Sequence, residues 1–298
     1  MGDAVLVTGA SSGLGLATST SLAKAGRPVI LGCRNAERGA AAASSIRAQA
    51  PDADVSVLEL DVANLSSVRA AVRALDGRPL GALVCNAGIQ LTTGVQRSPD
   101  GHELTFATNH LGHFLLIQSL LEHLGEPARI VLVSSGTHLG PLQSFGFPAP
   151  RWEDPRALAD PGLSSLGGSA RHGRIRYSTS KLANIYTTYE LARRLRDRKI
   201  TANAFDPGLM PETGLARDYP PPVRRLYARI APMLIRALPG VRPVDQSASD
   251  LAWLVTSPEP AAVSGAYFTG RTRRRSSAES YDEARAKELW EVSEELIS

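Results

Sequence analysis

Short apolar runs alternate along the chain with longer segments that have a helical pattern. Seven runs have the length and near-continuous hydrophobicity of strands buried on both faces, at residues 4–8, 28–33, 55–60, 82–86, 129–134, 200–205 and 264–268. Helical patterns lie at 13–25, 36–50, 64–75, 101–123, 177–197 and 246–256. Because crossovers between parallel strands are right-handed, this alternation leaves few topologies. It predicts an α/β fold with one doubly wound, mostly parallel, seven-stranded sheet in a single domain, residues 1–298.

Composition narrows the class of protein. Of 298 residues, 43% are hydrophobic, which is enough for a packed core, and the net charge of +4 is spread along the chain. The basic run 271–275 has no interleaved aromatic residues, so a solvated loop is expected there and no nucleic-acid site. No metal site is expected, and no apolar run reaches the roughly 18 residues that span a bilayer. Because Cys33 and Cys85 lie inside apolar runs, the expected location is a reducing compartment, the cytoplasm.

The first strand runs into a glycine-rich turn, TGASSGLG, at residues 8–15. In a doubly wound sheet this turn lies at the mouth of the ligand crevice, where amide groups at the start of a helix bind phosphate. Glycine lets the backbone approach such a ligand closely. An isolated turn of this kind also occurs without a ligand, so the pattern needs support from the rest of the chain. The residues expected to face a phosphate are Gly9, Ser11, Ser12, Gly13, Leu14 and Gly15.

Five further motifs follow: NAG at 86–88, NHLGHF at 109–114, VSS at 133–135, YSTSK at 177–181 and DPG at 206–208. Together with the spacing T-G-x-x-x-G-x-G of the first turn, their order and separation resemble the short-chain dehydrogenase/reductase family. The resemblance covers the chain from end to end and implies a Rossmann-type fold. It also implies a catalytic tetrad of Asn109, Ser135, Tyr177 and Lys181, with Ser134 as the alternative to Ser135.

Hydride transfer to a carbonyl group would require these residue types. Negative charge develops on the oxygen, so a hydrogen-bond donor and a proton source are needed. Tyr177 would supply the proton, and Lys181, one helical turn away, would lower its pKa. The resemblance implies that Lys181 also holds the cofactor ribose, that Ser135 hydrogen-bonds the substrate oxygen, and that Asn109 sustains a water link to Lys181. The alternative for Tyr177 and Lys181 is an ordinary surface pair.

The end of the second strand predicts which nicotinamide cofactor is used. A carboxylate there would repel a ribose 2′-phosphate, but the sequence has GCRN, in which Arg34 precedes Asn35. A guanidinium binds phosphate, so NADP(H) is predicted over NAD(H), with a solvated surface arginine as the alternative. The resemblance implies further cofactor contacts from Asp61, Val62, Asn86, Ala87, Gly88, Tyr177, Lys181, Pro207, Gly208 and Thr213.

Within the family, longer stretches resemble the branch of light-dependent protochlorophyllide reductase, retinol-dehydrogenase-like and polyketide-ketoreductase-like enzymes. Examples are LVCNAGI, GHELTFATNHLGHFLL and SKLANIYTTYELARRL. The pigment enzymes carry a cysteine after the Pro-Gly pair, where this chain has Leu209. The prediction is therefore an NADPH-dependent ketoreductase that acts on a bulky apolar substrate. Reduction of a C=C bond, as in the pigment enzymes, is one alternative, and a non-catalytic NADP-sensing regulator is another.

Two segments rich in Pro, Gly and Arg leave the strand–helix alternation. The segment 136–176 is expected as an insert on the substrate side, where its aromatic residues line the pocket or pack within the insert. The segment 207–245 is expected as a lid-like excursion, because its basic amphipathic stretch 220–240 would cover the pocket or lie on a membrane surface. The aromatic residues of the insert are Phe145, Phe147 and Trp152.

The expected partner of the chain is a small apolar molecule. Many relatives dimerise through helices next to the catalytic tyrosine, and the long insert could block that surface, so the resemblance leaves monomer and homodimer open. His138 and His172 of the insert are not expected to act as bases, because Tyr177 already supplies acid–base chemistry.

Overall fold

The computed structural model describes residues 3–210 and 240–298. The described residues form one sheet of eight strands in the order β3-β2-β1-β4-β5-β6-β7-β8. The strands are β1 (Ala4–Thr8), β2 (Val29–Cys33), β3 (Val55–Glu59), β4 (Leu80–Cys85), β5 (Leu124–Val133), β6 (Ile200–Asp206), β7 (Ala266–Thr269) and β8 (Thr272–Arg274). β1 to β7 pair in parallel, which confirms the doubly wound sheet. The order reverses between β1 and β4, and such switch points are where these sheets bind ligands.

The eighth strand corrects the predicted number of seven. β8 runs antiparallel to β7, with Tyr267 opposite Arg274 and Thr269 opposite Thr272. The run 271–275, expected as a loop, therefore contributes the edge of the sheet. All three residues of β8 are exposed, so this strand lacks the apolar alternation that marks a strand in a sequence. A charged edge of this kind discourages pairing with another chain.

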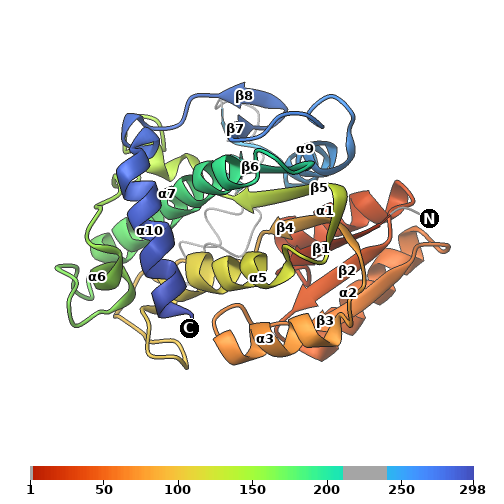
Figure 1. The fold of residues 1–298 in the computed structure, drawn as a ribbon, viewed down its shortest axis with the longest axis horizontal. Coiled ribbons are helices and arrows are strands. Elements are labelled where there is room, and N and C mark those ends of the chain that lie inside the picture. Colours follow the sequence, from red (N-terminus) through yellow and green to blue (C-terminus); the bar gives the residue numbers. More distant parts are fainter. Residues whose placement is uncertain (1–2, 211–239) are drawn as a thin grey trace, which may run out of the picture.

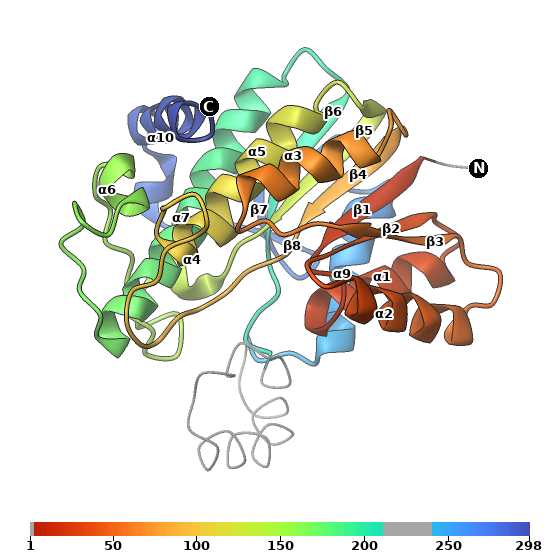
Figure 2. The same cartoon turned by 90° about the horizontal axis from the view of Figure 1, so that it is seen from below.

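Helices cover both faces of the sheet (Figure 2). α1 (Gly13–Lys24), α2 (Ala36–Gln49) and α9 (Val244–Thr256) lie on one face, and α3 (Leu65–Ala74), α5 (Gly112–Leu120) and α7 (Ala170–Arg194) lie on the other. β1 shows how a strand divides between the two cores, because Ala4 and Leu6 belong to one and Val5 and Val7 to the other. Burial on both faces explains the near-continuous apolar runs of the sequence.

The insert is shorter than predicted. α7 begins at Ala170, seven residues before the expected start, because Ser169 caps it by accepting a hydrogen bond from the amide of His172. The insert that was predicted to end at residue 176 therefore ends at residue 169. It contains a 3-10 turn (Gly136–Leu139) and the short helix α6 (Pro155–Ala159).

The helix predicted over 101–123 is three elements in succession. They are α4 (Leu104–Phe106), a π-helical turn (Ala107–Leu111) and α5. Wider turns of the π type are rare and occur frequently at functional sites. This one carries Asn109.

A C-terminal helix, α10 (Glu283–Leu296), is missing from the predicted elements and packs across α7 in the structure (Figure 1). It follows a short 3-10 turn (Ala278–Tyr281). Trp290 packs edge-on against Phe114 of α5, with 4.9 Å between the ring centroids. The sequence holds the signal for this helix, because Asp282 caps it and its buried residues recur at helical spacing. α10 thus covers the outer side of α5 and α7.

Some expectations lie outside the described residues. Thr213 and residues 220–239 belong to this part, so the threonine contact and the lid or membrane-surface helix stay predictions. In the described part, no helix is long and apolar enough to cross a bilayer. Cys33 and Cys85 are buried free thiols, as expected of small core residues.

Candidate active site

The candidate catalytic pair lies on α7 beside the end of β5. Tyr177 and Lys181 are one helical turn apart, and only 5% and 4% of their surfaces are exposed. Lys181 Nζ lies 5.6 Å from the centre of the Tyr177 ring and donates a 2.9 Å hydrogen bond to the carbonyl of Val133, the last residue of β5. An ordinary surface pair would not be this buried, so the alternative reading of the two residues does not fit.

The two adjacent serines have different partners. Ser134 is buried, and its Oγ donates to the main-chain carbonyl of Lys181 at 2.9 Å, which ties β5 to α7. Ser135 hydrogen-bonds Tyr177 through their side chains, and its Oγ also accepts from the amide of Thr137 at 3.4 Å. Ser135, rather than Ser134, therefore faces the tyrosine.

Asn109 completes the group from the π-helical turn. Its Oδ1 accepts from the amide of Ile89 at 2.8 Å, and its Nδ2 donates to the carbonyl of Ile89 at 3.0 Å and to Ser180 Oγ at 2.9 Å. A Cβ added at Gly88 would lie 3.2 Å from Asn109 Oδ1 and 3.5 Å from Lys181 Nζ. Gly88, Asn109 and Lys181 therefore converge on one small space.

Burial and one carboxylate set the protonation of the catalytic pair. Burial raises the pKa of Tyr177 above its usual range, the hydrogen bond with Ser135 lowers it, and the charge of Asp206 raises it. Burial lowers the pKa of Lys181 to about 8, and the charge of Asp206 acts in the opposite direction. Lys181 was expected to lower the pKa of Tyr177, but burial is the largest effect here, and the pKa is raised. Tyr177 is therefore protonated at neutral pH.

Asp206 is a functional candidate to which the sequence reasoning assigned no role. It ends β6 and is only 6% exposed. Its Oδ2 accepts from the Tyr267 hydroxyl at 3.0 Å, and its Oδ1 accepts from the amide of Gly208 at 3.0 Å. A Cβ at Gly136 would lie 3.3 Å from Asp206 Oδ2, so this carboxylate stands beside the turn after Ser135. The sequence did offer a signal for this role, because Asp206 is an acidic residue at the end of a predicted buried strand.

The glycine-rich turn fits a bound pyrophosphate. α1 begins at Gly13, the side chain of Ser12 makes no capping hydrogen bond, and the first turn has no acidic residue. The first amide groups of α1 are thus available to an anion. A Cβ at Gly15 would lie 2.5 Å from the carbonyl oxygen of Gly9, and one at Gly9, where φ is +67°, would lie 2.9 Å from Ala87 Cα. Only glycine permits this close approach, and Leu14 is buried beneath it.

Thr8 and His113 join the cofactor turn to the catalytic turn. Thr8 Oγ1 accepts from the amides of Asn86 and Ala87, both at 2.9 Å, and lies 2.9 Å from His113 Nε2 and 3.4 Å from the carbonyl of Val84. Because the carbonyl of Asn109 can only accept, His113 Nδ1 carries the proton and donates to it at 3.3 Å, which leaves Nε2 to accept from Thr8. Burial lowers the pKa of His113 to about 4, which keeps the ring neutral. The NHLGHF motif contained His113, but sequence reasoning gave it no role.

A second arginine accompanies Arg34 at the end of β2. Arg34 is exposed, and the side chain of Asn35 caps α2 by accepting from the amide of Arg38 at 2.8 Å. Burial raises the pKa of the Cys33 thiol, whereas a hydrogen bond with Ser11 and the charge of Arg38 lower it. Ser11 thus hydrogen-bonds Cys33 at this strand end, and the charge of Arg38 reaches the same thiol. Sequence reasoning missed Arg38, although its i+4 spacing from Arg34 was visible.

The remaining described cofactor candidates stand after other strands of the same sheet edge. Asp61 Oδ1 accepts from the amide of Ala63 at 3.0 Å, and Val62 between them is buried. Asn86 Nδ2 donates to the Thr8 carbonyl at 2.8 Å, which holds the NAG turn against the glycine turn. Pro207 and Gly208 follow β6. Among the described residues, no cluster of His, Cys, Asp or Glu could hold a metal ion.

The insert brings one of its aromatic residues to the tyrosine. The ring of Phe147 lies edge-on to Tyr177, with 5.9 Å between centroids. Trp152 instead packs on Tyr186 of α7 at 4.7 Å, next to the core, so it neither contacts Tyr177 nor packs within the insert. Phe145 is 52% exposed. His138 Nδ1 lies 2.6 Å from the carbonyl of Ser135, and burial lowers the pKa of His138, so it is a neutral structural group.

Comparisons with known proteins agree with this geometry. Residues 3–146 match the family described as short chain dehydrogenase. Retinol dehydrogenase 14 of Homo sapiens is 36% identical and is covered to 86%, with 99% of this chain aligned. Protochlorophyllide reductase of Daucus carota is 35% identical over 98% of this chain and 77% of its own length. A solved structure of an uncharacterized protein from Mycobacterium Paratuberculosis has a TM-score of 0.73 and 31% identity, over 99% of this chain and 93% of that one.

Proposed function

We propose a specific reaction for this chain, which belongs to the short-chain dehydrogenase/reductase family and is an NAD(P)-dependent oxidoreductase. The reaction is the NADPH-dependent reduction of a carbonyl group on a bulky apolar substrate. The observation that carries the proposal is the convergence of Asn109, Ser135, Tyr177 and Lys181 on one buried space at the carboxyl edge of the sheet. A regulator without turnover would have no need of all four groups together.

The chemistry divides among these residues. A bound nicotinamide cofactor supplies the hydride. Tyr177, whose burial keeps its hydroxyl protonated, gives its proton to the substrate oxygen, and Ser135 donates a hydrogen bond to the same oxygen. Lys181, with a pKa of about 8, holds the cofactor ribose and returns a proton toward Tyr177. Asn109 fixes the turn beside Lys181 through its two hydrogen bonds with Ile89.

The preference for NADPH rests on charge at the end of β2. Arg34 follows β2 directly, and Arg38 lies in the first turn of α2, where its charge lowers the pKa of Cys33; the acid of that turn, Glu37, stands between the two arginines in the sequence. Arg34→Glu should weaken NADPH binding roughly 10- to 100-fold and spare NADH, measured by fluorescence titration. Lys24→Glu, the same charge change at the far end of α1, is the control. Unchanged NADPH affinity in Arg34→Glu would remove this assignment.

The bulky substrate is inferred from an aromatic ring beside Tyr177 and from the relatives. Phe147 lies against Tyr177, and retinol and protochlorophyllide, which appear in the names of two relatives, are large apolar molecules. The second candidate reaction is reduction of a C=C bond, as the name of the second relative suggests. Leu209 stands where the resembling pigment enzymes carry a cysteine, so we favour the carbonyl reaction in the dark.

One experiment tests the reaction class. NADPH consumption is followed in the dark with phenanthrenequinone, retinal and protochlorophyllide, beside an illuminated pigment sample and the variant Tyr177→Phe. We expect dark turnover of a carbonyl compound that falls roughly 10²- to 10⁴-fold in the variant. Turnover of the pigment alone, and only in light, would replace the carbonyl reaction with the second candidate. Full activity of the variant would remove the role of Tyr177.

We also propose a cellular location, which rests on the two cysteines. The buried free thiols Cys33 and Cys85 suit a reducing compartment such as the cytoplasm.

A further inference from the structure

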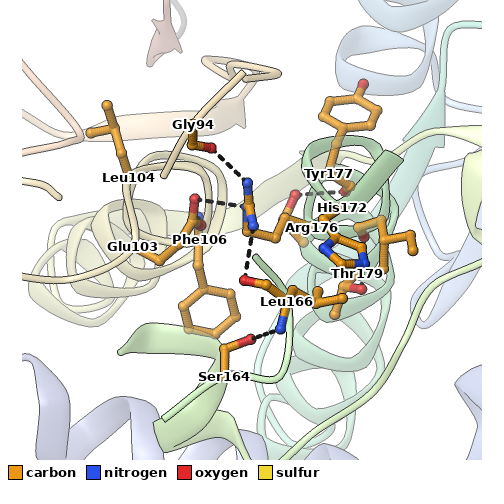
Figure 3. A network of polar contacts seen from close by, with 12 residues as sticks. Gly94, Glu103, Leu104, Phe106, Ser164, Leu166, His172, Arg176, Tyr177 and Thr179 are labelled. Atoms are coloured by element: carbon orange, nitrogen blue, oxygen red, sulfur yellow. Dashed lines mark hydrogen bonds and ion pairs between the residues drawn. The ribbon is translucent and has the colours of Figure 1, made fainter. Parts of the chain in front are cut away.

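Arg176, the residue before Tyr177, is a buried cation with an unusual set of partners (Figure 3). Its side chain is 7% exposed. Nη1 donates to the carbonyls of Leu166 at 3.3 Å and Gly167 at 2.8 Å, and Nη2 donates to the carbonyl of Gly94 at 2.9 Å. One planar guanidinium therefore joins α7 to two loops that are far apart in the sequence.

Glu103 supplies the counter-charge. Its side chain is 4% exposed, and its Oε1 lies 3.4 Å from Arg176 Nε. The other oxygen, Oε2, accepts from the amide of Phe106 at 2.7 Å and so caps the helical segment that leads to Asn109. The main-chain amide of Glu103 donates to the carbonyl of Ala159 in the insert at 2.7 Å. The ion pair thus links the helical segment that leads to Asn109 with α7, which carries Tyr177 and Lys181.

The two loops that meet at Arg176, residues 89–103 and 159–168, are called the rim here. They also contact each other directly, because the amide of Gly94 donates to the carbonyl of Gly168 at 3.0 Å. A Cβ at Gly168 would lie 3.3 Å from Gly94 Cα, so the two backbones are close. The first loop starts at Ile89, whose main chain makes two hydrogen bonds with the side chain of Asn109. Further along the same loop, Arg176 donates to the carbonyl of Gly94 and forms the ion pair with Glu103.

A buried charge is a costly way to hold loops together. Apolar contacts stabilise a fold at least as well as a buried ion pair, but a guanidinium also requires its acceptors at set positions in one plane. Here those acceptors are three carbonyls of the rim, whose loops have little regular structure of their own. The pair consequently fixes where the rim stands relative to Tyr177 and Asn109.

We propose that Arg176, with Glu103, is a positioning residue that sets substrate selectivity by holding the rim against the tetrad. The inference rests on the proposed reaction for its kinetic consequence, but its structural part stands independently. A rim held in one place presents a defined wall to a large rigid substrate. A small substrate touches little of that wall and is less sensitive to its position.

Two variants separate positioning from folding. Arg176→Met leaves the Glu103 carboxylate buried without its partner and should lower the melting temperature. Arg176→Met with Glu103→Leu removes both charges, and we expect it to recover part of that stability, because the amide of Phe106 also loses its acceptor. Neither variant restores a donor for the carbonyls of Leu166, Gly167 and Gly94. Arg171→Met, on the exposed first turn of α7, is the control.

The kinetic measurement compares phenanthrenequinone, a rigid three-ring dicarbonyl, with propanal in the presence of NADPH. In the double variant we expect the ratio of their kcat/KM values to fall about tenfold, mainly through a higher KM for the quinone. Arg171→Met should keep the ratio of the unaltered chain. Arg176→Lys, which retains a cation, should have a ratio between those of the double variant and the unaltered chain. A double variant that is stable and keeps the full ratio would overturn the proposal.

Hydrogen exchange gives a second readout that needs no turnover. The amide of Gly94 should exchange at least tenfold faster in the double variant with NADPH bound, while amides of β1 keep their rate. Equal exchange at Gly94 in the double variant and the unaltered chain would also overturn the proposal. If no carbonyl compound is reduced but exchange at Gly94 rises, the proposed reaction fails and the positioning role stands.

Discussion

The cofactor half of the molecule, residues 3–88, and the rim are held in place by different means. In the cofactor half, short turns connect strands buried on both faces, and the anchor is the Thr8 hydroxyl with its main-chain amide donors. In the rim, loops are held by a few polar side chains, of which Arg176 and Glu103 are the most buried ion pair. Packing of regular strands and helices thus positions the candidate cofactor residues, whereas single polar side chains position the loops of the rim.

This difference makes the two regions respond unequally to the same change. A backbone inside a packed sheet layer has nowhere to move, because its neighbours are fixed on all sides. A loop that rests against a helix can shift away from it. An added methyl group that overlaps the backbone should therefore lower the free energy of unfolding more in the cofactor half than in the rim.

The largest effect is expected at Gly112, the first residue of α5, because it packs against the backbone of Val62 in the cofactor half. A Cβ there would lie 1.8 Å from the carbonyl oxygen of Val62, just after β3. We expect Gly112→Ala to lower the free energy of unfolding by about 3 kcal/mol or more, measured by urea denaturation. Gly173→Ala places a Cβ 2.0 Å from the carbonyl oxygen of Leu91 in the rim, and we expect a loss of only about 1–2 kcal/mol.

The control for both is Gly167→Ala. Its Cβ would come no closer than 3.6 Å to His172 Nδ1, so the free energy of unfolding should change by less than about 0.5 kcal/mol. Equal losses in Gly112→Ala and Gly173→Ala would show that the rim is as rigid as the cofactor half.

Next in size is the anchor of the cofactor half. Thr8→Val keeps the shape of the side chain but removes the hydroxyl that serves Asn86, Ala87 and His113. Leaving such buried groups without a partner should cost about 2 kcal/mol, with weaker NADPH binding in a fluorescence titration. Thr8→Ser retains the hydroxyl and should keep most of the affinity. If valine and serine behave alike, the methyl group and not the hydroxyl matters.

A smaller effect is expected outside both regions, at Asp206 beside the catalytic pair. Reduction that needs charged Lys181 should decline as pH rises through about 8, because burial has lowered the lysine pKa to that value. Since the Asp206 charge raises the pKa of Lys181, Asp206→Asn should move this decline to lower pH. The measurement is kcat/KM against pH, with the exposed Glu122→Gln as the control. A limb that moves upward would contradict this assignment.

The sequence predicted the cofactor half well because its signals are local. Buried parallel strands read as continuous apolar runs, and the glycine turn needs residues of one type at fixed spacing. The same logic failed at β8, whose exposed Thr272–Arg274 follows no apolar pattern and pairs only because β7 lies beside it. α10 was missed although Asp282 and its helical spacing were visible.

The candidate site was predictable in its motifs but less so in its surroundings. The family resemblance implied Tyr177 and Lys181, and helical spacing put them on one face, whereas the protonation of Tyr177 depends on burial, which no spacing reveals. His113, Asp206 and Arg176 act through partners that are distant in sequence. Their roles required the fold.

The smallest effect is expected from a second ion pair of the rim. Arg97 Nη2 and Asp160 Oδ1 are 2.9 Å apart, but their side chains are 52% and 45% exposed. Water screens both charges, so Arg97→Ala should change the free energy of unfolding by less than about 0.5 kcal/mol and leave the quinone-to-propanal ratio within about twofold. Urea denaturation and the same kinetic assay check both values. A loss of selectivity as large as that expected for Arg176→Met with Glu103→Leu would mean that charge in the rim matters regardless of burial, and the contrast between its two ion pairs would disappear.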